Sequence, residues 1–311
     1  MSWPADRMLR GAFTALVTPF KGDGSVDEHA FRDFVNWQLL AGIDGLVPCG
    51  TTGESPTLSS AEKDALIDWT VEAVRSRSSS RGVAVIAGTG TNDTAASIAA
   101  TRRAAALGAD AALVVTPYYN RPDQRMIEAH YRAIADEGDL PVVVYNVPSR
   151  TGSNVEAATL LRLAAHPRIV AVKEASGNLD QIQTIIRNRP AGFSVLAGDD
   201  SWTLTVLAHG GEGVVSVVSN EIPGPMTALC AAARAGDWDE ARRLHGRYLP
   251  LFRANFITVN PVPVKSALAA MGLMGDHVRQ PLLPLIDPQR GQLMEVLREA
   301  GLVAPVAGVA R

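Results

Sequence analysis

The sequence has little cysteine, few aromatic residues and no strong excess of charge of either sign. Cys49 and Cys230 are the only cysteines among 311 residues, too few and too far apart for a disulfide scaffold or a zinc ribbon. The 29 Lys and Arg against 32 Asp and Glu give a formal charge of −3, so there is no electrostatic reason to expect nucleic acid or an anionic membrane as partner. We therefore expect small-molecule chemistry in a reducing cytoplasm.

Long hydrophobic runs are also missing. No uninterrupted apolar stretch approaches the roughly 20 residues that a membrane-spanning helix needs, and the opening MSWPADRMLR lacks the apolar core of a secretory signal. The six histidines show neither H-x-H nor H-E-x-x-H spacing, so the sequence offers no evident ligands for a metal ion. We expect a protein that stays where it is made and holds no metal centre.

What the sequence does contain is a regular alternation of two kinds of segment. Short β-branched apolar runs are each followed by a longer stretch whose apolar residues repeat at helical spacing. The predicted strands cover residues 13–18, 44–49, 83–88, 111–116, 141–146, 169–174, 193–198 and 213–218. The predicted helices cover residues 27–41, 59–77, 93–107, 123–137, 154–165, 178–188, 201–209 and 222–235.

Eight strands, apolar on both faces and alternating strictly with eight helices, predict a (β/α)8 TIM barrel in residues 1–236. The alternative is an open doubly wound sheet, which usually carries a G-x-G-x-x-G turn after its first strand, and that turn is missing here. After residue 236 only helical patterns remain, near 237–254, 262–272 and 288–300. Residues 237–311 are therefore predicted to form a C-terminal helical extension.

In a barrel of this kind the active site lies where the strands end, so unusual residues at those positions are the first candidates. The turn GTTGES (50–55) follows the second strand, and the hydroxyls of Thr51 and Thr52 with nearby amides would suit a carboxylate or phosphate. A plain helix-entry turn would explain the same residues. The turn therefore remains a candidate with a structural alternative.

Two further strand ends carry aromatic and basic residues. TPYYNRP (116–122) contains Tyr118 and Tyr119, which could equally belong to an interface. YNVPSRTG (145–152) places Tyr145 at the end of the fifth strand and Arg150 in the loop that follows, where an arginine is most often simply solvated.

Lys173 gives the sharpest signal, because it interrupts the apolar run IVAVKEA (169–175) of the sixth strand. Burial disfavours the ammonium form, and a neutral amine can attack a carbonyl carbon to form a Schiff base. The alternative is a structural lysine paired with Glu174, but neighbouring residues of a strand face opposite ways. We therefore favour Lys173 as a nucleophile.

Two other candidates have simpler explanations. Asp199 and Asp200 follow the seventh strand as a possible acid pair, but Asp and Ser ahead of a helical run favour helix capping. Cys49 precedes the GTTGES turn, yet no histidine follows at a credible strand end. A buried spectator thiol is the better prediction for Cys49.

With these residues identified, the sequence resembles the dihydrodipicolinate synthase family, within the pyruvate-dependent class I aldolases that include N-acetylneuraminate lyase. The resemblance runs from about residue 13 to residue 301 and rests on GTTGES, TPYYNRP, YNVPSRTG, VKEASGN, AGDD and NPVPVK in order. The wider group shares the lysine, the strand-five tyrosine and a related glycine-rich turn. Arg150 and the tyrosine pair are what favour the synthase.

The resemblance implies a lyase-type enzyme that condenses pyruvate with L-aspartate-4-semialdehyde on the route to lysine and diaminopimelate, without a cofactor. Lys173 would form an imine with pyruvate that becomes an enamine. Thr52 would hold the pyruvate carboxylate, and Tyr145 would shuttle protons. Thr51 and Tyr119 would complete the proton relay, Tyr119 by reaching into the site of a neighbouring subunit.

The resemblance also implies the second-substrate site and the assembly. Arg150 would bind the carboxylate of the semialdehyde, while Gly198 and Val215 would supply main-chain surroundings. A dimer that shares Tyr119 would be the minimum functional unit, and a homotetramer is the family expectation. Two alternatives stay open: an aldolase of the same mechanism acting on a 2-keto-3-deoxy sugar acid or sialic acid, and a catalytically silent barrel that binds a keto acid.

The resemblance further leads us to expect weak or absent inhibition by lysine. Family members inhibited by lysine carry His, His and Glu at the positions of Ser60, Lys63 and Ala96, although Asn92 and Tyr118 are retained. Replacing the glutamate removes the anion that would pair with the effector's ammonium group, and Lys63 adds a like charge. Inhibition by sub-millimolar lysine in an assay of the purified protein would contradict this expectation.

Overall fold

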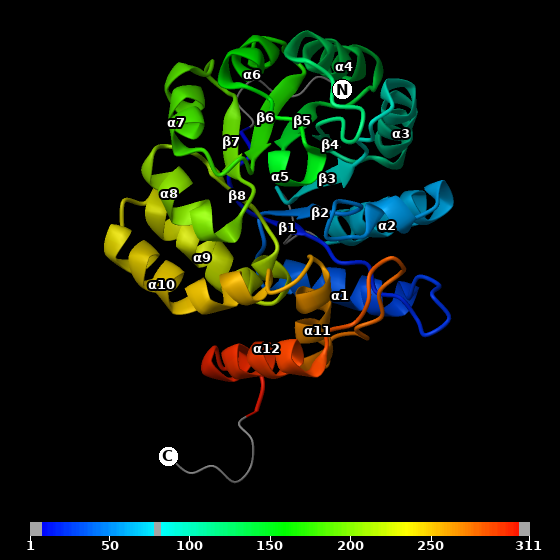
Figure 1. The fold of residues 1–311 in the computed structure, drawn as a ribbon, viewed down its shortest axis with the longest axis vertical. Helices are drawn as coiled ribbons and strands as arrows, with labels where there is room; N and C mark the ends of the chain where they lie inside the picture. The colour runs from blue at the N-terminus through cyan, green and yellow to red at the C-terminus, as the bar shows by residue number, and fades with distance from the viewer. Residues whose placement is uncertain (1–7, 78–81, 305–311) are drawn as a thin grey trace.

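The computed structural model describes residues 8–77 and 82–304, in which parallel strands close into a barrel in chain order (Figure 1). The strands are β1 (Gly11–Ala15), β2 (Gly45–Val47), β3 (Ala84–Gly88), β4 (Ala111–Val115), β5 (Val142–Asn146), β6 (Ile169–Glu174), β7 (Ser194–Ala197) and β8 (Gly213–Ser216). Each strand pairs with the next, and β8 returns to β1, with Val215 opposite Phe13. The predicted (β/α)8 barrel is confirmed.

Helices follow the strands around the outside of the barrel (Figure 1). They are α1 (Glu28–Leu40), α2 (Ser60–Arg75), α3 (Thr94–Leu107), α4 (Gln124–Glu137), α5 (Pro148–Thr151), α6 (Ala157–Ala164), α7 (Leu179–Asn188), α8 (Thr203–Ala208) and α9 (Pro223–Arg234). Short 3-10 turns, η1 (Ser55–Thr57), η3 (Asp200–Trp202) and η4 (Val218–Asn220), join strands to helices. The side chains of Asp27, Ser59 and Asp93 accept amide hydrogen bonds at helix starts, which explains why α1, α2 and α3 begin where they do.

The C-terminal extension consists of α10 (Trp238–Ala254), α11 (Val262–Ala270) and α12 (Asp287–Glu299), as the sequence predicts. Figure 1 shows α11 and α12 next to each other at the lower edge of the molecule. Buried side chains of these helices, among them Leu251, Val264 and Leu293, belong to the same apolar core as the barrel helices. The division into residues 1–236 and 237–311 stays a prediction.

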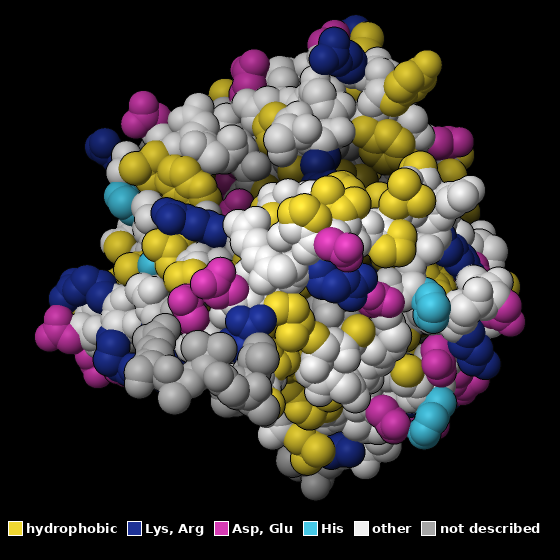
Figure 2. Space-filling view, turned by 60° about the horizontal axis from the view of Figure 1, so that its bottom comes forward, with side chains coloured by type: hydrophobic (Ala, Val, Ile, Leu, Met, Phe, Trp, Pro, Cys, Tyr) yellow, Lys and Arg dark blue, Asp and Glu magenta, His cyan; other side chains and the backbone are white. Residues whose placement is uncertain are grey.

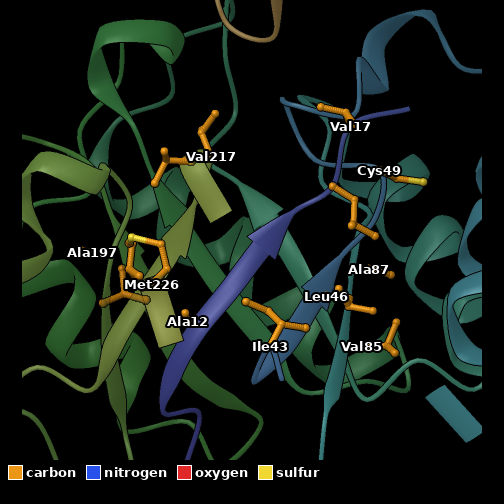
Figure 3. Packing of buried hydrophobic residues seen from close by; sticks show 14 of the residues in the cluster. Ala12, Val17, Ile43, Leu46, Cys49, Val85, Ala87, Ala197, Val217 and Met226 are labelled. Atoms are coloured by element: carbon orange, nitrogen blue, oxygen red, sulfur yellow. The ribbon is translucent and has the colours of Figure 1, made fainter. Parts of the chain in front are cut away.

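The strands bury apolar side chains on both faces, because alternate residues point into and out of the barrel. One apolar cluster fills the interior and includes Phe13, Leu113 and Val215. The other lies between strands and helices, and Figure 3 shows Leu46 and Val85 in it. Alternation therefore decides which strand residues can reach a site inside the barrel.

The structure corrects several predicted boundaries: β2 and β8, for example, end at residues 47 and 216 rather than at 49 and 218. β1 ends at residue 15 rather than 18, since the Val17 amide donates to Asn220 Oδ1 (3.1 Å) instead of a neighbouring strand. Residues 148–151, predicted as loop, form the one-turn helix α5. Pro148 favours the first helical position, and Gly152, with a φ of 70°, ends the turn. Arg150 is thus held on a helix.

The surface carries interspersed charges. Figure 2 shows Lys and Arg side chains beside Asp and Glu over the face in view, without a broad area of one sign. Arg32, for example, forms ion pairs with Glu28 and Glu72, both at 2.8 Å. Among the helices of the described residues, none combines the length and apolar character needed to cross a membrane.

Barrel closure between β8 and β1 requires a glycine at position 213, because a Cβ there would lie 1.9 Å from the carbonyl oxygen of Gly11. We expect Gly213→Ala to lower the free energy of unfolding by at least about 3 kcal/mol, measured by chemical denaturation. Gly246→Ala is the control, since a methyl at that position in α10 meets no atom within 4 Å. It should raise stability by about 0.5–1 kcal/mol. Equal stability of the two variants would contradict the close approach.

Candidate active site

A cavity of about 250 Å³ opens where β2, β3, β4 and β5 end. Its walls come from the last residues of these strands and from the segments that follow them. Three of the predicted site residues, Thr51, Tyr145 and Arg150, line it, together with Cys49, Lys63, Leu113 and Tyr118. The cavity therefore brings together three of the predicted residues, whereas Lys173 and Thr52 are not among the residues that line it.

Lys173 and Tyr145 lie side by side at the ends of neighbouring strands. The register of β5 and β6 pairs the two residues directly, and both side chains are buried. Lys173 Nζ lies 4.2 Å from the centroid of the Tyr145 ring. Within residues 8–77 and 82–304, Lys173 forms no ion pair, whereas the other lysine in an apolar run, Lys265, is paired with Glu54 at 2.7 Å. A buried amine without a counter-ion suits nucleophilic attack on a carbonyl carbon.

Glu174 faces away from Lys173, as alternation along the strand predicts. Its Oε2 accepts hydrogen bonds from Asn146 Nδ2 (3.1 Å) and Gln181 Nε2 (3.3 Å), and its Oε1 accepts one from the Ser176 amide (2.7 Å). Burial raises the pKa of Glu174, and these hydrogen bonds oppose that rise. The carboxyl group therefore fixes the end of β6 to β5 and α7 and does not pair with the amine of Lys173.

The GTTGES turn presents its two threonines differently. Thr51 lines the cavity, whereas Thr52 is buried and its Oγ1 accepts a hydrogen bond from Asn260 Nδ2 (3.0 Å). The turn is tight, because a Cβ on Gly53 would lie 3.0 Å from the Leu16 carbonyl oxygen. α2 is capped further along the chain by Ser59, and the GTTGES turn leads instead into the 3-10 turn η1, which begins at Ser55.

Arg150 and the tyrosine pair lie at the cavity mouth. Arg150 is exposed and lines both the cavity and an adjoining surface groove, to which Tyr119 and Arg121 also contribute. Tyr118 lines the cavity, but Tyr119 does not and is 89% exposed. The structure of one chain therefore does not bring Tyr119 together with Tyr145.

Gly198 and Val215 lie on the β6–β8 side of the barrel. A Cβ on Gly198 would lie 2.6 Å from the Cβ of Ala175, so a side chain there would separate the ends of β6 and β7. Val215 is buried in the barrel interior. Neither residue lines the cavity.

The remaining two candidates have structural roles in this chain. Burial raises the pKa of Cys49 to about 12, which keeps the thiol protonated and fits a spectator. Asp199 caps η3 by accepting from the Ser201 amide (2.9 Å), as predicted. Asp200 departs from the capping prediction, since its Oδ2 accepts from the amides of Val217 (3.0 Å) and Val218 (2.9 Å) and so ties the end of β7 to the end of β8. Burial raises the pKa of Asp200 to about 6.

Sequence reasoning missed a set of contacts through which residues of the C-terminal extension bind the GTTGES turn. Glu54 Oε1 accepts from Lys265 Nζ (2.7 Å), and Glu54 Oε2 accepts from the Arg279 amide (2.9 Å). Lys265 Nζ also donates to the Thr18 carbonyl (2.8 Å), and burial lowers the pKa of Lys265. The signal was present, because Lys265 interrupts the apolar NPVPVK segment much as Lys173 interrupts its strand.

The chain matches the Dihydrodipicolinate synthetase family over residues 8–300. It is 49% identical over 296 residues to the 4-hydroxy-tetrahydrodipicolinate synthase of Koribacter versatilis, covering 95% of this chain and 97% of that protein. A monomeric dihydrodipicolinate synthase variant superposes with a TM-score of 0.91 at 41% identity, covering 95% of this chain and 98% of that chain. The chloride-inhibited dihydrodipicolinate synthase of Acinetobacter baumannii, complexed with pyruvate, gives a TM-score of 0.92 at 38% identity, covering 95% and 100% of the respective chains.

Proposed function

This chain belongs to the Dihydrodipicolinate synthetase family, and from that membership we propose that the cavity beside Lys173 is the active site of a Schiff-base synthase. The chain catalyses the 4-hydroxy-tetrahydrodipicolinate synthase reaction, which condenses pyruvate with L-aspartate-4-semialdehyde on the route to lysine and diaminopimelate. The observation that carries this conclusion is the buried amine of Lys173 against the Tyr145 ring, with no ion-pair partner among the described residues, in a chain that is 49% identical to a known synthase.

The chemistry needs an amine and proton transfers but no cofactor. The neutral amine of Lys173 attacks the keto carbon of pyruvate, and the keto oxygen leaves as water to give an imine. The imine nitrogen takes up a proton, and loss of a methyl proton from this iminium gives the enamine, whose carbon attacks the aldehyde carbon of the second substrate while the aldehyde oxygen gains a proton. The amino group of that substrate then attacks the imine carbon, which closes the ring and releases Lys173 unchanged.

The protons and the first carboxylate are handled by residues from two strand ends. Tyr145 transfers protons at the imine and at the incoming aldehyde, and its contact with Lys173 supports this role. Thr51 lines the cavity with Tyr145 and joins the relay. Thr52 and the amides of its turn hold the pyruvate carboxylate.

The second substrate enters at the cavity mouth. Arg150 binds the carboxylate of the semialdehyde, and its position on α5 at the cavity wall supports this. Gly198 and Val215 shape the opposite side of the barrel through their backbone.

We also propose a homotetramer built from dimers in which Tyr119 of one chain completes the relay of its neighbour. The 89% exposure of this tyrosine supports a partner contact. In sedimentation velocity the chain should migrate as a tetramer, and a monomer, the state of one similar dihydrodipicolinate synthase variant, would contradict this assembly. The two free, buried cysteines support a reducing cytoplasm as its compartment.

Borohydride reduction tests the nucleophile directly. With pyruvate present, it should trap a covalent adduct on Lys173, detected by mass spectrometry of the intact chain and its peptides. Lys173→Ala should abolish the adduct and lower kcat by at least about 1000-fold. Lys21→Ala, at an exposed lysine, is the control and should form the adduct and keep the wild-type kcat. Failure of the wild-type chain to form the adduct would contradict the mechanism.

Substitution of Arg150 tests the second substrate. Arg150→Ala should reduce kcat/KM for L-aspartate-4-semialdehyde by about 100-fold, because a charge-assisted contact is lost, while the pyruvate adduct still forms. Arg125→Ala, an exposed arginine at the start of α4, should leave kcat/KM unchanged. Retro-aldol cleavage of a 2-keto-3-deoxy sugar acid or N-acetylneuraminate by the wild-type chain would instead favour the aldolase alternative.

A further inference from the structure

The NPVPVK segment (260–265) leads into α11, which starts at Val262, and lies against the turn that carries the threonines of the site. Asn260, which is buried, donates from Nδ2 to Thr52 Oγ1 at 3.0 Å. Five residues further on, Lys265 is fully buried and forms the ion pair with Glu54 at 2.7 Å. The extension therefore contacts the turn at Thr52, through a side-chain amide, and at Glu54, through an ion pair.

The polarity of the first contact matters. A threonine hydroxyl has one proton to donate and two lone pairs to accept with. Because Asn260 supplies the proton in their hydrogen bond, the proton of Thr52 is left for another acceptor. Among the described residues, no protein group accepts a hydrogen bond from Thr52 Oγ1. A substrate carboxylate is a group that would accept that proton.

The Asn260 side chain is poorly explained as a structural element alone. Its Oδ1 is buried and has no hydrogen-bond partner among the described residues. A buried acceptor without a partner destabilises the fold, so an apolar side chain at this position would be expected if packing were its purpose. An apolar side chain could not donate the hydrogen bond that Asn260 gives to Thr52.

We propose that Asn260 is a positioning residue for pyruvate, which orients the Thr52 hydroxyl so that its proton points to the substrate carboxylate. The Glu54–Lys265 pair holds the same turn in place, so that the threonine is fixed both in position and in hydrogen-bond polarity. This inference rests on the proposed function, and it gives the C-terminal extension a part in substrate binding.

The test measures the pyruvate concentration that gives half-maximal borohydride-trapped adduct, a readout that needs no second substrate. Asn260→Ala should raise this concentration by about tenfold, the effect of losing one oriented hydrogen bond to a charged group. Thr52→Val should raise it at least as much. Adding Asn260→Ala to Thr52→Val should change it by less than about twofold, because the amide acts through the hydroxyl.

Controls separate this role from a structural one. Asn188→Ala removes an asparagine that donates to the Thr184 carbonyl (2.8 Å) on exposed α7, and it should leave half-saturation unchanged. If Asn260→Ala does not fold, Asn260→Asp keeps the shape and replaces the donor by an acceptor that takes the Thr52 proton. That variant should raise half-saturation by at least tenfold, on the order of the same lost hydrogen bond.

The outcomes distinguish the two proposals. A wild-type chain that forms no adduct contradicts the proposed function itself. A wild-type chain that forms the adduct, with unchanged half-saturation in Asn260→Ala or with additive effects of the Asn260 and Thr52 substitutions, contradicts only the positioning role. A lower unfolding temperature with unaltered half-saturation would show that Asn260 serves stability alone.

Discussion

The alternation of side chains along β6 is the constraint on which the site depends. It sends Lys173 into the barrel interior and Glu174 into the layer beneath the helices, so that adjacent residues of opposite charge cannot neutralise each other. The strand register then places Tyr145 beside the amine. A single-residue slip of β6 would exchange the two side chains and replace an unpaired amine with a carboxylate inside the barrel.

The chain buries two lysines and treats them in opposite ways. Lys265 has a carboxylate, a carbonyl and the Phe20 ring around its ammonium group, which suits a fixed positive charge. Lys173 has an aromatic ring and no counter-ion among the described residues. The difference in partners, rather than in burial, separates the anchoring Lys265 from Lys173, the proposed nucleophile, and it is visible only once the chain has folded.

Much of the fold was predictable from the sequence, because alternating β-branched and amphipathic segments allow few architectures. Lys173 was predictable for a related reason, since a charged residue inside an apolar strand is rare and demands an explanation. The helix α5 escaped prediction because four residues are too few for a periodic pattern. The role of Asp200 could not be predicted, because its partners, the amides of Val217 and Val218, follow a different strand. The contact between Thr52 and Asn260 joins residues 208 positions apart, and no local pattern reports such a pair.

The GTTGES turn contacts residues more than 200 positions further along the chain, and this separation has a consequence for how the site forms during synthesis. A nascent chain that has emerged as far as residue 236 already contains the eight strands of the barrel, Lys173 and the tyrosine beside it. It still lacks Asn260, which precedes α11, and Lys265 in the first turn of α11, so neither Thr52 nor Glu54 has its partner from the extension at that stage. The barrel can therefore be complete in its strands while the GTTGES turn, the proposed site for the pyruvate carboxylate, still lacks its contacts with the extension. On this proposal, the last quarter of the polypeptide determines when the protein is ready for its first substrate.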